Sequence, residues 1–238
     1  MTFSHVALAP CRESGAVNSQ AMSPTILADA VETVFPVLVI CGVVLFIAGI
    51  IALGIRQQKK ARENFRKLAA QIGLIVPDQK PSFFSSGSLN ASGQLRGRRV
   101  TIWAYTTGSG KSRVQWCAVA AQARNTGKLT LRVSGENFFT RVGRAFGVDD
   151  VKTGDASFDE KFYVKSNDAA YVQAALIPEV RANFAAAWQS GARGTIKAEG
   201  DEVRYAETGS FSSEKICARF PALAELVCDL ADIVETRG

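Results

Sequence analysis

The chain has 238 residues and a formal net charge of +6, and its composition excludes several common kinds of site. A Ser–His or Cys–His hydrolase needs a base beside its nucleophile, but the single histidine, His5, lies in the N-terminal tail. The five cysteines form no CxxC pair, so they favour neither a zinc site nor a disulfide framework, and they suit a reducing compartment. We therefore expect no metal, no cofactor and no enzymatic activity.

Much of the positive charge falls in one short segment. Residues 56–67 hold six bases and one acid, Glu63, whereas the chain beyond residue 67 is nearly balanced. The six bases are Arg56, Lys59, Lys60, Arg62, Arg66 and Lys67. Because the remaining chain has little excess of positive charge, we expect no nucleic-acid partner.

Residues 1–32 mix Ser, Ala, Pro and Asn without periodicity, which predicts a disordered tail. A cleaved signal is not expected, because no basic segment followed by a long apolar stretch precedes residue 33. Both Met1 and Met22 stay open as the true start, because nothing before Met22 has the pattern of a structural element.

Residues 33–55 form a run of 23 positions without a charged side chain. A helix of this length spans roughly 34 Å, enough to cross a hydrocarbon core of about 30 Å. Backbone groups in lipid must be satisfied within the segment, which requires a helix, and Pro36 suits its first turn. Gly42 and Gly49 fall on one face, where small residues allow two copies to pack as a homodimer.

The basic residues that follow predict the orientation of this transmembrane helix. Lys and Arg resist translocation, so the flank richer in them stays in the cytoplasm. We expect the tail, residues 1–32, outside and a cytoplasmic domain, residues 82–238, inside. In the first interpretation, these six bases are a topology signal and a solvated helix face. In the alternative, they bind anionic lipid headgroups, at about 1 kcal/mol per Lys or Arg.

The helix is predicted to continue as a basic juxtamembrane segment, residues 56–76. Phe65, Leu68, Ala69 and Ile72 form one apolar stripe, and Gly73 is a natural C-cap. The stripe covers too few turns for a coiled coil, so we expect it to pack on the domain.

Residues 82–133 alternate between apolar and polar positions with turn residues between them, which predicts a meander of antiparallel strands. Helical spacing then takes over: Ser134 is a candidate cap for a helix that ends at Gly147, Asp168 caps the next, and Pro178 opens another.

Short strands are expected near residues 162–164, 195–198 and 203–206, followed by a last helix that carries the apolar residues of 223–234. Pro221 either starts or kinks this helix. Runs of strands with helices between and after them, without regular βαβ alternation, predict an α+β domain with a mainly antiparallel sheet packed with helices.

The string TTGSGKS at residues 106–112 imitates the end of a phosphate-binding P-loop. Gly108, Gly110, Lys111 and Ser112 are the candidate phosphate residues. The first glycine of the motif is replaced by Tyr105, and the next segment has the pattern of a strand instead of a helix whose N-terminus would face a phosphate. A glycine-rich hairpin turn is therefore the favoured interpretation.

Acidic residues in the connector around 149–160 imitate a calcium loop, starting at Asp155. The sixth position is Glu160 instead of Gly and the twelfth is Ser166 instead of Glu, so the motif fails and solvated loop acids are expected. Cys217 and Cys228 are expected to be packing residues.

Residues 153–184 contain a Gly-acid-x-x-Phe-Asp-x-x-Phe-x-Val run before a helix and a Leu-x-Pro-Glu turn. Together with the hairpin sequence at 93–100, this resembles a pattern in uncharacterised bacterial single-pass membrane proteins. The resemblance implies an inner-membrane-anchored domain and supplies no catalytic residues. Phe158, Phe162 and Val164 would then be core residues, with Asp155 and Asp159 holding loop backbone.

Taken together, the sequence predicts a membrane-anchored cytoplasmic interaction or scaffold module, with membrane lipids and a protein as partners. Two alternatives remain open. One is an enzyme that binds a phosphate or nucleotide at the 108–112 loop, and the other is a sensor of anionic lipid through residues 56–67.

Overall fold

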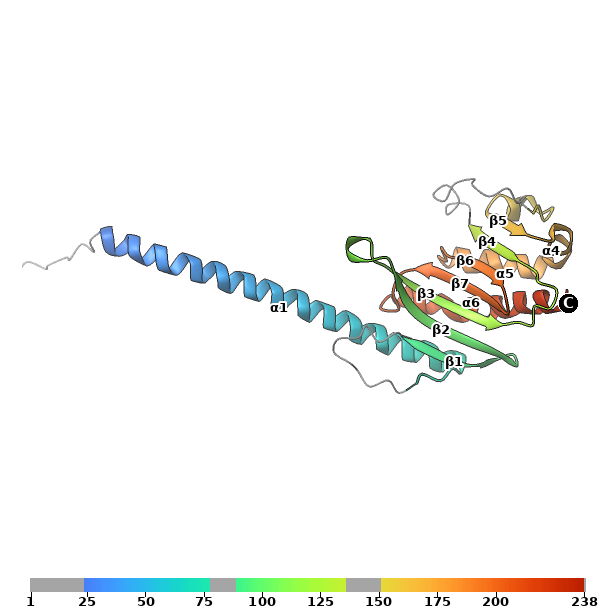
Figure 1. Ribbon diagram of the computed structural model, residues 1–238, viewed down its shortest axis with the longest axis horizontal. Helices are drawn as coiled ribbons and strands as arrows, with labels where there is room; N and C mark the ends of the chain where they lie inside the picture. Colours follow the sequence, from blue (N-terminus) through green and yellow to red (C-terminus); the bar gives the residue numbers. More distant parts are fainter. Residues whose placement is uncertain (1–23, 78–88, 136–150, 238) are drawn as a thin grey trace, which may run out of the picture. The chain divides into compact units, whose positions relative to one another are not determined.

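The computed structural model describes residues 24–77, 89–135 and 151–237, with side chains from residue 36 onward. The chain divides into two units, residues 1–53 and 54–238, each of which is described by itself. Figure 1 labels the helices and strands along the chain.

The first unit contains the N-terminal part of helix α1 (Pro24–Ile72). Its apolar side chains are exposed; Leu45 and Phe46, for example, are 73% and 70% exposed. Over Pro36–Ile72 the helix is long and apolar enough to cross a membrane. Because these side chains lie outside any core, the helix indicates a membrane-anchored protein.

Helix α1 begins before the apolar run, so the predicted tail of residues 1–32 is too long: residues 24–32 are helical. Proline suits the first turn of a helix, and Leu27 and Ala28 are good helix formers. For the same reason Pro36 lies inside the helix and not in its first turn. Residues 1–23, with both candidate start methionines, lie outside the described residues.

The C-terminal end of α1 belongs to the second unit and packs into its core, as the apolar stripe predicts. Phe65, Leu68 and Ala69 are 1%, 2% and 1% exposed. The Phe65 ring lies 5.0 Å from the ring of Phe211. Gly73 follows the helix with a φ of 76°, which confirms the predicted C-cap.

The second unit is built on one sheet of seven strands, all paired antiparallel. The strands are β1 (Asn90–Leu95), β2 (Arg98–Thr107), β3 (Val114–Gln122), β4 (Leu131–Gly135), β5 (Phe162–Ser166), β6 (Thr195–Glu199) and β7 (Glu202–Thr208). Their order across the sheet is β1-β2-β3-β7-β6-β4-β5.

Only the first three strands follow the predicted meander. Arg96 and Gly97 take positive φ in the tight turn between β1 and β2, and β3 follows β2 in space. The meander prediction is wrong for β4, because the hairpin β6–β7 lies between β3 and β4. Alternation of apolar and polar residues predicts which side chains of a strand face the core, but it does not predict which strands pair with it.

The described helices of the second unit after α1 are α3 (Ala156–Asp159), α4 (Ala169–Ala175), α5 (Pro178–Gln189) and α6 (Glu214–Thr236). Asp168 caps α4 and Pro178 opens α5, as predicted. Helix α6 begins at Glu214, so Pro221 lies inside it and does not start it. Ser134 belongs to β4, and the helix predicted after it lies outside the described residues.

One face of the sheet packs against α5 and α6. The ring of Tyr205 on β7 lies 6.1 Å from Trp188 of α5 and 6.2 Å from Phe220 of α6. No described helix packs on the opposite face, called the open face below, and Figure 1 shows α5 and α6 behind the sheet. The prediction of an α+β domain with an antiparallel sheet is confirmed.

Candidate functional site

Four basic side chains form a line across the open face. Arg132 on β4 pairs in register with Lys165 on β5 and with Lys197 on β6, and Lys197 pairs with Arg204 on β7. These four residues are called the basic row. Neighbouring strands lie about 4.8 Å apart, so the row is about 14 Å long.

Arg204 and Lys165 each have a described neighbour. Arg204 lies 3.8 Å from Glu202, and the Lys165 Nζ lies 5.4 Å from the centre of the Tyr163 ring. Across the described ranges no carboxylate pairs with Arg132 or Lys197, and the buried Arg132 Nε has no hydrogen-bond partner. Like charges directly opposite each other, such as Arg132 and Lys197, repel and so weaken the pairing of the two strands.

A groove of about 350 Å³ lies along the basic row. Arg132, Lys165 and Lys197 line it, and Glu199 is the one acid among its lining residues. Asn167 also lines the groove, but its side-chain oxygen accepts from the Thr130 N–H and its side-chain nitrogen donates to the Lys128 carbonyl, both in the loop before β4. A ligand in this groove would therefore meet mainly cations.

Two hydroxyl groups without a partner lie on the same face. Ser134 on β4 and Thr195 on β6 pair in register, and each has a buried Oγ atom that makes no hydrogen bond. Ser134 is 1% exposed. Each is two positions along its strand from Arg132 or Lys197, so both share the open face with the basic row.

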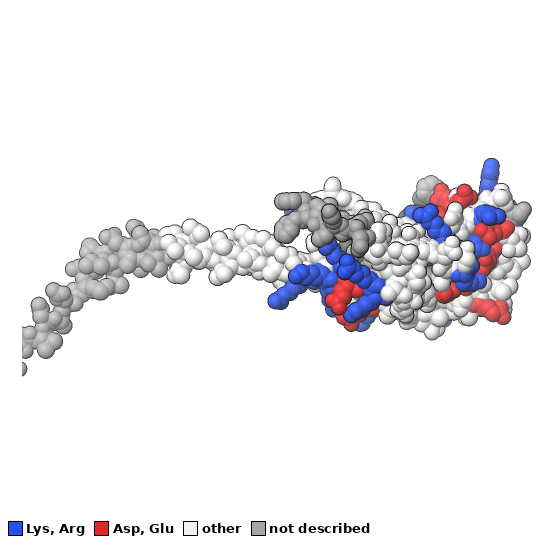
Figure 2. Space-filling model, turned by 90° about the horizontal axis from the view of Figure 1, so that it is seen from below, with Lys and Arg blue, Asp and Glu red and all other residues white. Residues whose placement is uncertain are grey.

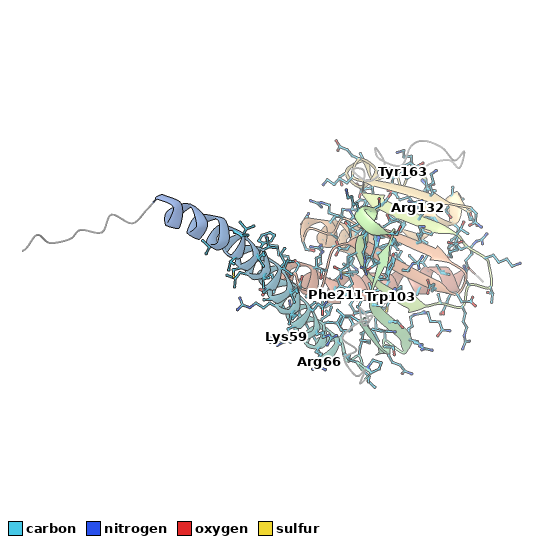
Figure 3. All side chains as sticks on the ribbon, turned by 60° about the vertical axis from the view of Figure 1, so that its left-hand side comes forward. Lys59, Arg66, Trp103, Arg132, Tyr163 and Phe211 are labelled. Atoms are coloured by element: carbon cyan, nitrogen blue, oxygen red, sulfur yellow. The ribbon has the colours of Figure 1, made fainter. Side chains whose placement is uncertain are left out.

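The other half of the open face carries an aromatic cluster. Ring centres of Trp103 and Tyr105 are 6.4 Å apart, and those of Tyr105 and Trp116 are 6.1 Å apart. A second groove, of about 490 Å³, lies beside Trp103, and it is lined by Arg99 together with Glu202. Trp103, Arg132 and Tyr163 in Figure 3 come from three different strands of the sheet.

The six bases predicted to contact lipid headgroups lie on the part of α1 in the second unit. Five of them are exposed and Arg62 is half-buried. Lys60 Nζ lies 3.0 Å from a carboxylate oxygen of Glu214, and Lys67 Nζ lies 3.0 Å from one of Glu63. For the other four, the described part of the chain offers no ion pair. Figure 2 shows basic side chains gathered around a few acidic ones over this segment.

The predicted phosphate residues Gly108, Gly110, Lys111 and Ser112 lie in the turn between β2 and β3. Gly108 has a φ of 76°, and a Cβ there would lie 2.3 Å from the Ser112 carbonyl oxygen, so this position requires glycine. Within the turn, Gly110–Ser112 form one short 3-10 helix, η1, and strand β3 follows it, so no α-helix begins directly after Lys111 as a P-loop requires. The favoured hairpin interpretation is confirmed.

The acidic loop before β5 stabilises its own backbone. The Asp159 carboxylate accepts hydrogen bonds from the Thr153 N–H at 2.9 Å and from its hydroxyl at 2.8 Å. The Asp155 carboxylate caps α3 by accepting from the Ser157 and Phe158 N–H groups. Hydrogen bonds from Ser157 and Phe158 lower the pKa of Asp155. The residues with described side chains hold no cluster of three or more metal-ligating groups.

The two C-terminal cysteines are packing residues, as predicted. Cys228 is fully buried and Cys217 packs partly buried against the core. Burial raises the pKa of each thiol to about 11, so both are protonated at neutral pH.

Sequence reasoning missed the basic row. Each of its members occupies a polar position in an alternating strand, which is the signal that was present in the sequence. They come together because β6 and β7 lie between β3 and β4 in the sheet and β4 pairs with both β5 and β6.

These features define a membrane-anchored α+β protein with an open, basic sheet face. No protein-family model matches the sequence, and no curated protein matches it. Among solved structures, the chain is similar to the mycobacterial trehalose monomycolate transport factor A, TtfA, at 11% identity and a TM-score of 0.48. The match covers 73% of this chain and 93% of that chain. A likeness at this level carries no argument about the function of the present chain.

Proposed function

We propose that this chain is a bacterial, single-pass interaction module of the inner membrane with its second unit in the cytoplasm. In this proposal it is not an enzyme; its basic juxtamembrane segment binds anionic lipid headgroups and its domain recruits a partner to the membrane surface. The observation that supports it best is the division of the end of α1 into two faces. Phe65, Leu68 and Ala69 are buried in the core, while the bases between them are exposed.

Helix geometry places the first of these bases at headgroup depth. Arg56, Lys59 and Lys60 follow the apolar run within about 8 Å along the helix axis. The polar region of a bilayer is about 5 to 8 Å thick on each side of the hydrocarbon core. Unpaired cations there gain attraction from anionic lipids, at about 1 kcal/mol each.

Lipid binding can be tested on residues 54–238, because they form one unit with their own core. We expect co-sedimentation with vesicles that contain anionic lipid, weakened by salt. Substituting Arg56, Lys59, Arg62 and Arg66 by Gln should weaken binding by about fivefold per charge. The control variant carries four Gln substitutions at exposed bases outside α1, namely Arg99, Lys111, Arg113 and Lys161, and it should bind more tightly than the α1 variant. Equal binding to neutral vesicles, or equal losses in both variants, would contradict lipid recognition by this segment.

The proposed orientation has its own test. Protease added outside intact cells should leave the second unit whole, and the same protease should digest it in inverted membrane vesicles. Digestion from outside the cell would place the domain on the opposite side and refute a cytoplasmic role.

The 108–112 loop gives a second candidate function, phosphate or nucleotide binding, but its turn geometry does not favour it. Stabilisation by nucleotide that is lost in Lys111→Ala would support that function.

A further inference from the structure

We propose that the hairpin between β2 and β3 is a further membrane-contact site, whose cations bind the headgroups of an anionic bilayer. Its residues, 105–116, are called the hairpin arm below. The site rests on the membrane anchoring of the proposed function, but it uses other residues than the α1 bases. Either contact can therefore fail without the other.

The hairpin arm projects beyond the rest of the sheet. β1 begins opposite Trp103, and β7 ends opposite Trp116. The last register pairs of β2 with β3, the outermost of which joins Thr107 to Val114, therefore lie beside no other described strand. Residues 106–115 are all exposed, so this extension adds nothing to the core.

Contacts within the arm hold it in shape. Tyr105 and Trp116 stand opposite each other in register, with ring centres 6.1 Å apart and ring planes 10° apart. The Trp116 Nε1–H donates to the Thr107 hydroxyl at 2.8 Å. A two-stranded hairpin is marginally stable in water by itself, so these contacts keep the tip in a defined position.

The tip of the arm carries two cations. Lys111 and Arg113 are exposed, and residues 79–135 contain no Asp or Glu. In the part of the chain that the structure describes, neither side chain has a carboxylate partner. Each such cation near an anionic membrane strengthens binding by about fivefold.

The arm points towards the end of α1 that enters the second unit from the membrane. Ser92 of β1, which pairs in register with Thr101 of β2, also pairs with Ile75, just beyond the C-terminal end of α1. At the other end of the sheet, the segment after β7 returns to α1, where the rings of Phe211 and Phe65 lie 5.0 Å apart. Strand β2 therefore follows α1 from its C-terminal end back towards Phe65, and Figure 1 shows the hairpin extending on that side of the sheet.

Lengths along α1 and along the arm bring the tip to headgroup depth. Phe65, which marks the level of the base of the arm, lies ten residues after Ile55, or about 15 Å along the helix axis. From Trp116 the arm extends back by about 10 Å, over two strand positions and the turn. When α1 stands near the bilayer normal, the tip lies about 5 Å beyond the hydrocarbon core, inside a polar region about 5 to 8 Å thick.

An anionic bilayer suits this tip better than a free phosphate or a nucleotide. The Ser112 N–H donates to the Ser109 carbonyl at 3.1 Å, so it is not available to cradle a phosphate. Exposed cations at the end of a projecting arm need no pocket to meet a planar array of headgroups. The occupant of this site is therefore the surface of the membrane in which α1 is anchored.

The first experiment measures co-sedimentation of residues 54–238, which form one unit with their own core, with vesicles of phosphatidylcholine and phosphatidylglycerol. Lys111→Gln combined with Arg113→Gln should weaken binding by about 25-fold, at about fivefold per charge. The matched control, Arg99→Gln combined with Lys128→Gln, also removes one exposed Arg and one exposed Lys, at the start of β2 and in the loop after β3. It should change binding by less than about threefold. Equal losses in both double variants would show attraction by net charge alone and overturn the proposal.

The α1 variant, with four bases replaced by Gln, separates the two sites. A loss in the hairpin variant alone would support the hairpin arm and contradict lipid binding by α1, whereas losses in both variants would support both contacts. A loss in the α1 variant alone would keep the proposed function and refute the hairpin arm. The four-base control variant includes Lys111 and Arg113, so it should lose two lipid contacts, against four for the α1 variant.

The second experiment uses the full chain in nanodiscs, with amide hydrogen exchange as the readout. Residues 106–115 should exchange more slowly in nanodiscs that contain phosphatidylglycerol than in nanodiscs of phosphatidylcholine alone. Residues 124–128, in the loop at the opposite end of β3, should exchange equally in both and serve as the internal control. Lys111→Gln combined with Arg113→Gln should remove the difference. Equal exchange of residues 106–115 in the two kinds of nanodisc would overturn the proposal.

Discussion

The buried ion pair between Glu207 and Arg219 should be the most sensitive polar contact in the domain. The Arg219 Nε and Nη2 atoms donate to the two carboxylate oxygens at 3.0 and 2.7 Å, and Glu207 is 1% exposed. The hydroxyl of neighbouring Tyr205 accepts from the Gly194 N–H at 3.1 Å, and burial raises the pKa of Tyr205 above its ordinary value. Removing Arg219 would leave the buried carboxylate of Glu207 without a counter-charge.

We expect Arg219→Met to lower the free energy of unfolding by about 3–5 kcal/mol, the usual penalty for an uncompensated buried charge. In a domain of this size, that corresponds to a fall in Tm of roughly 6–20 °C.

The assay is urea denaturation of residues 54–238, followed by tryptophan fluorescence. The double variant Glu207→Leu with Arg219→Met should return to within about 1 kcal/mol of the natural chain, because an apolar pair of similar volume can replace a buried ion pair. Glu63→Gln, which breaks the exposed pair with Lys67, should change stability by less than about 0.5 kcal/mol. If Arg219→Met costs no more than Glu63→Gln, the reasoning about burial is wrong.

Three further changes test other contacts by the same denaturation assay. Phe65→Ala should cost about 3–5 kcal/mol, because this side chain of α1 is 1% exposed, and an effect below about 1 kcal/mol would mean that α1 does not pack there. Hydrogen bonds from Arg98 lower the pKa of Glu235 from 4.5 to about 2. The contribution of these hydrogen bonds to the free energy of unfolding is complete above about pH 4.5 and is lost as the pH falls towards 2. Glu235→Gln should therefore lower the free energy of unfolding at neutral pH by about 1–2 kcal/mol, after allowance for solvent screening. Lys197→Gln should stabilise the fold by about 0.2–1 kcal/mol by relieving repulsion with Arg132; a loss would contradict that repulsion.

Local patterns predicted the ends of several elements correctly. Gly73 ends α1, Asp168 caps α4 and Pro178 opens α5, because each depends on backbone groups within one turn. Ser134, predicted as a cap, belongs to β4, and the helix expected after it lies outside the described residues. Its pairing with Thr195 on β6 joins residues far apart in the chain, which a local pattern does not predict.

By itself, the sequence determined that a charge-free run of 23 residues precedes a basic segment and an α+β domain, because length, hydropathy and periodicity are local properties. It also determined which side chains of each strand share a face. Only the tertiary structure decided that β6 and β7 lie between β3 and β4. That order depends on contacts between residues far apart in the chain, and it brings Lys165, Arg132, Lys197 and Arg204 together as one row.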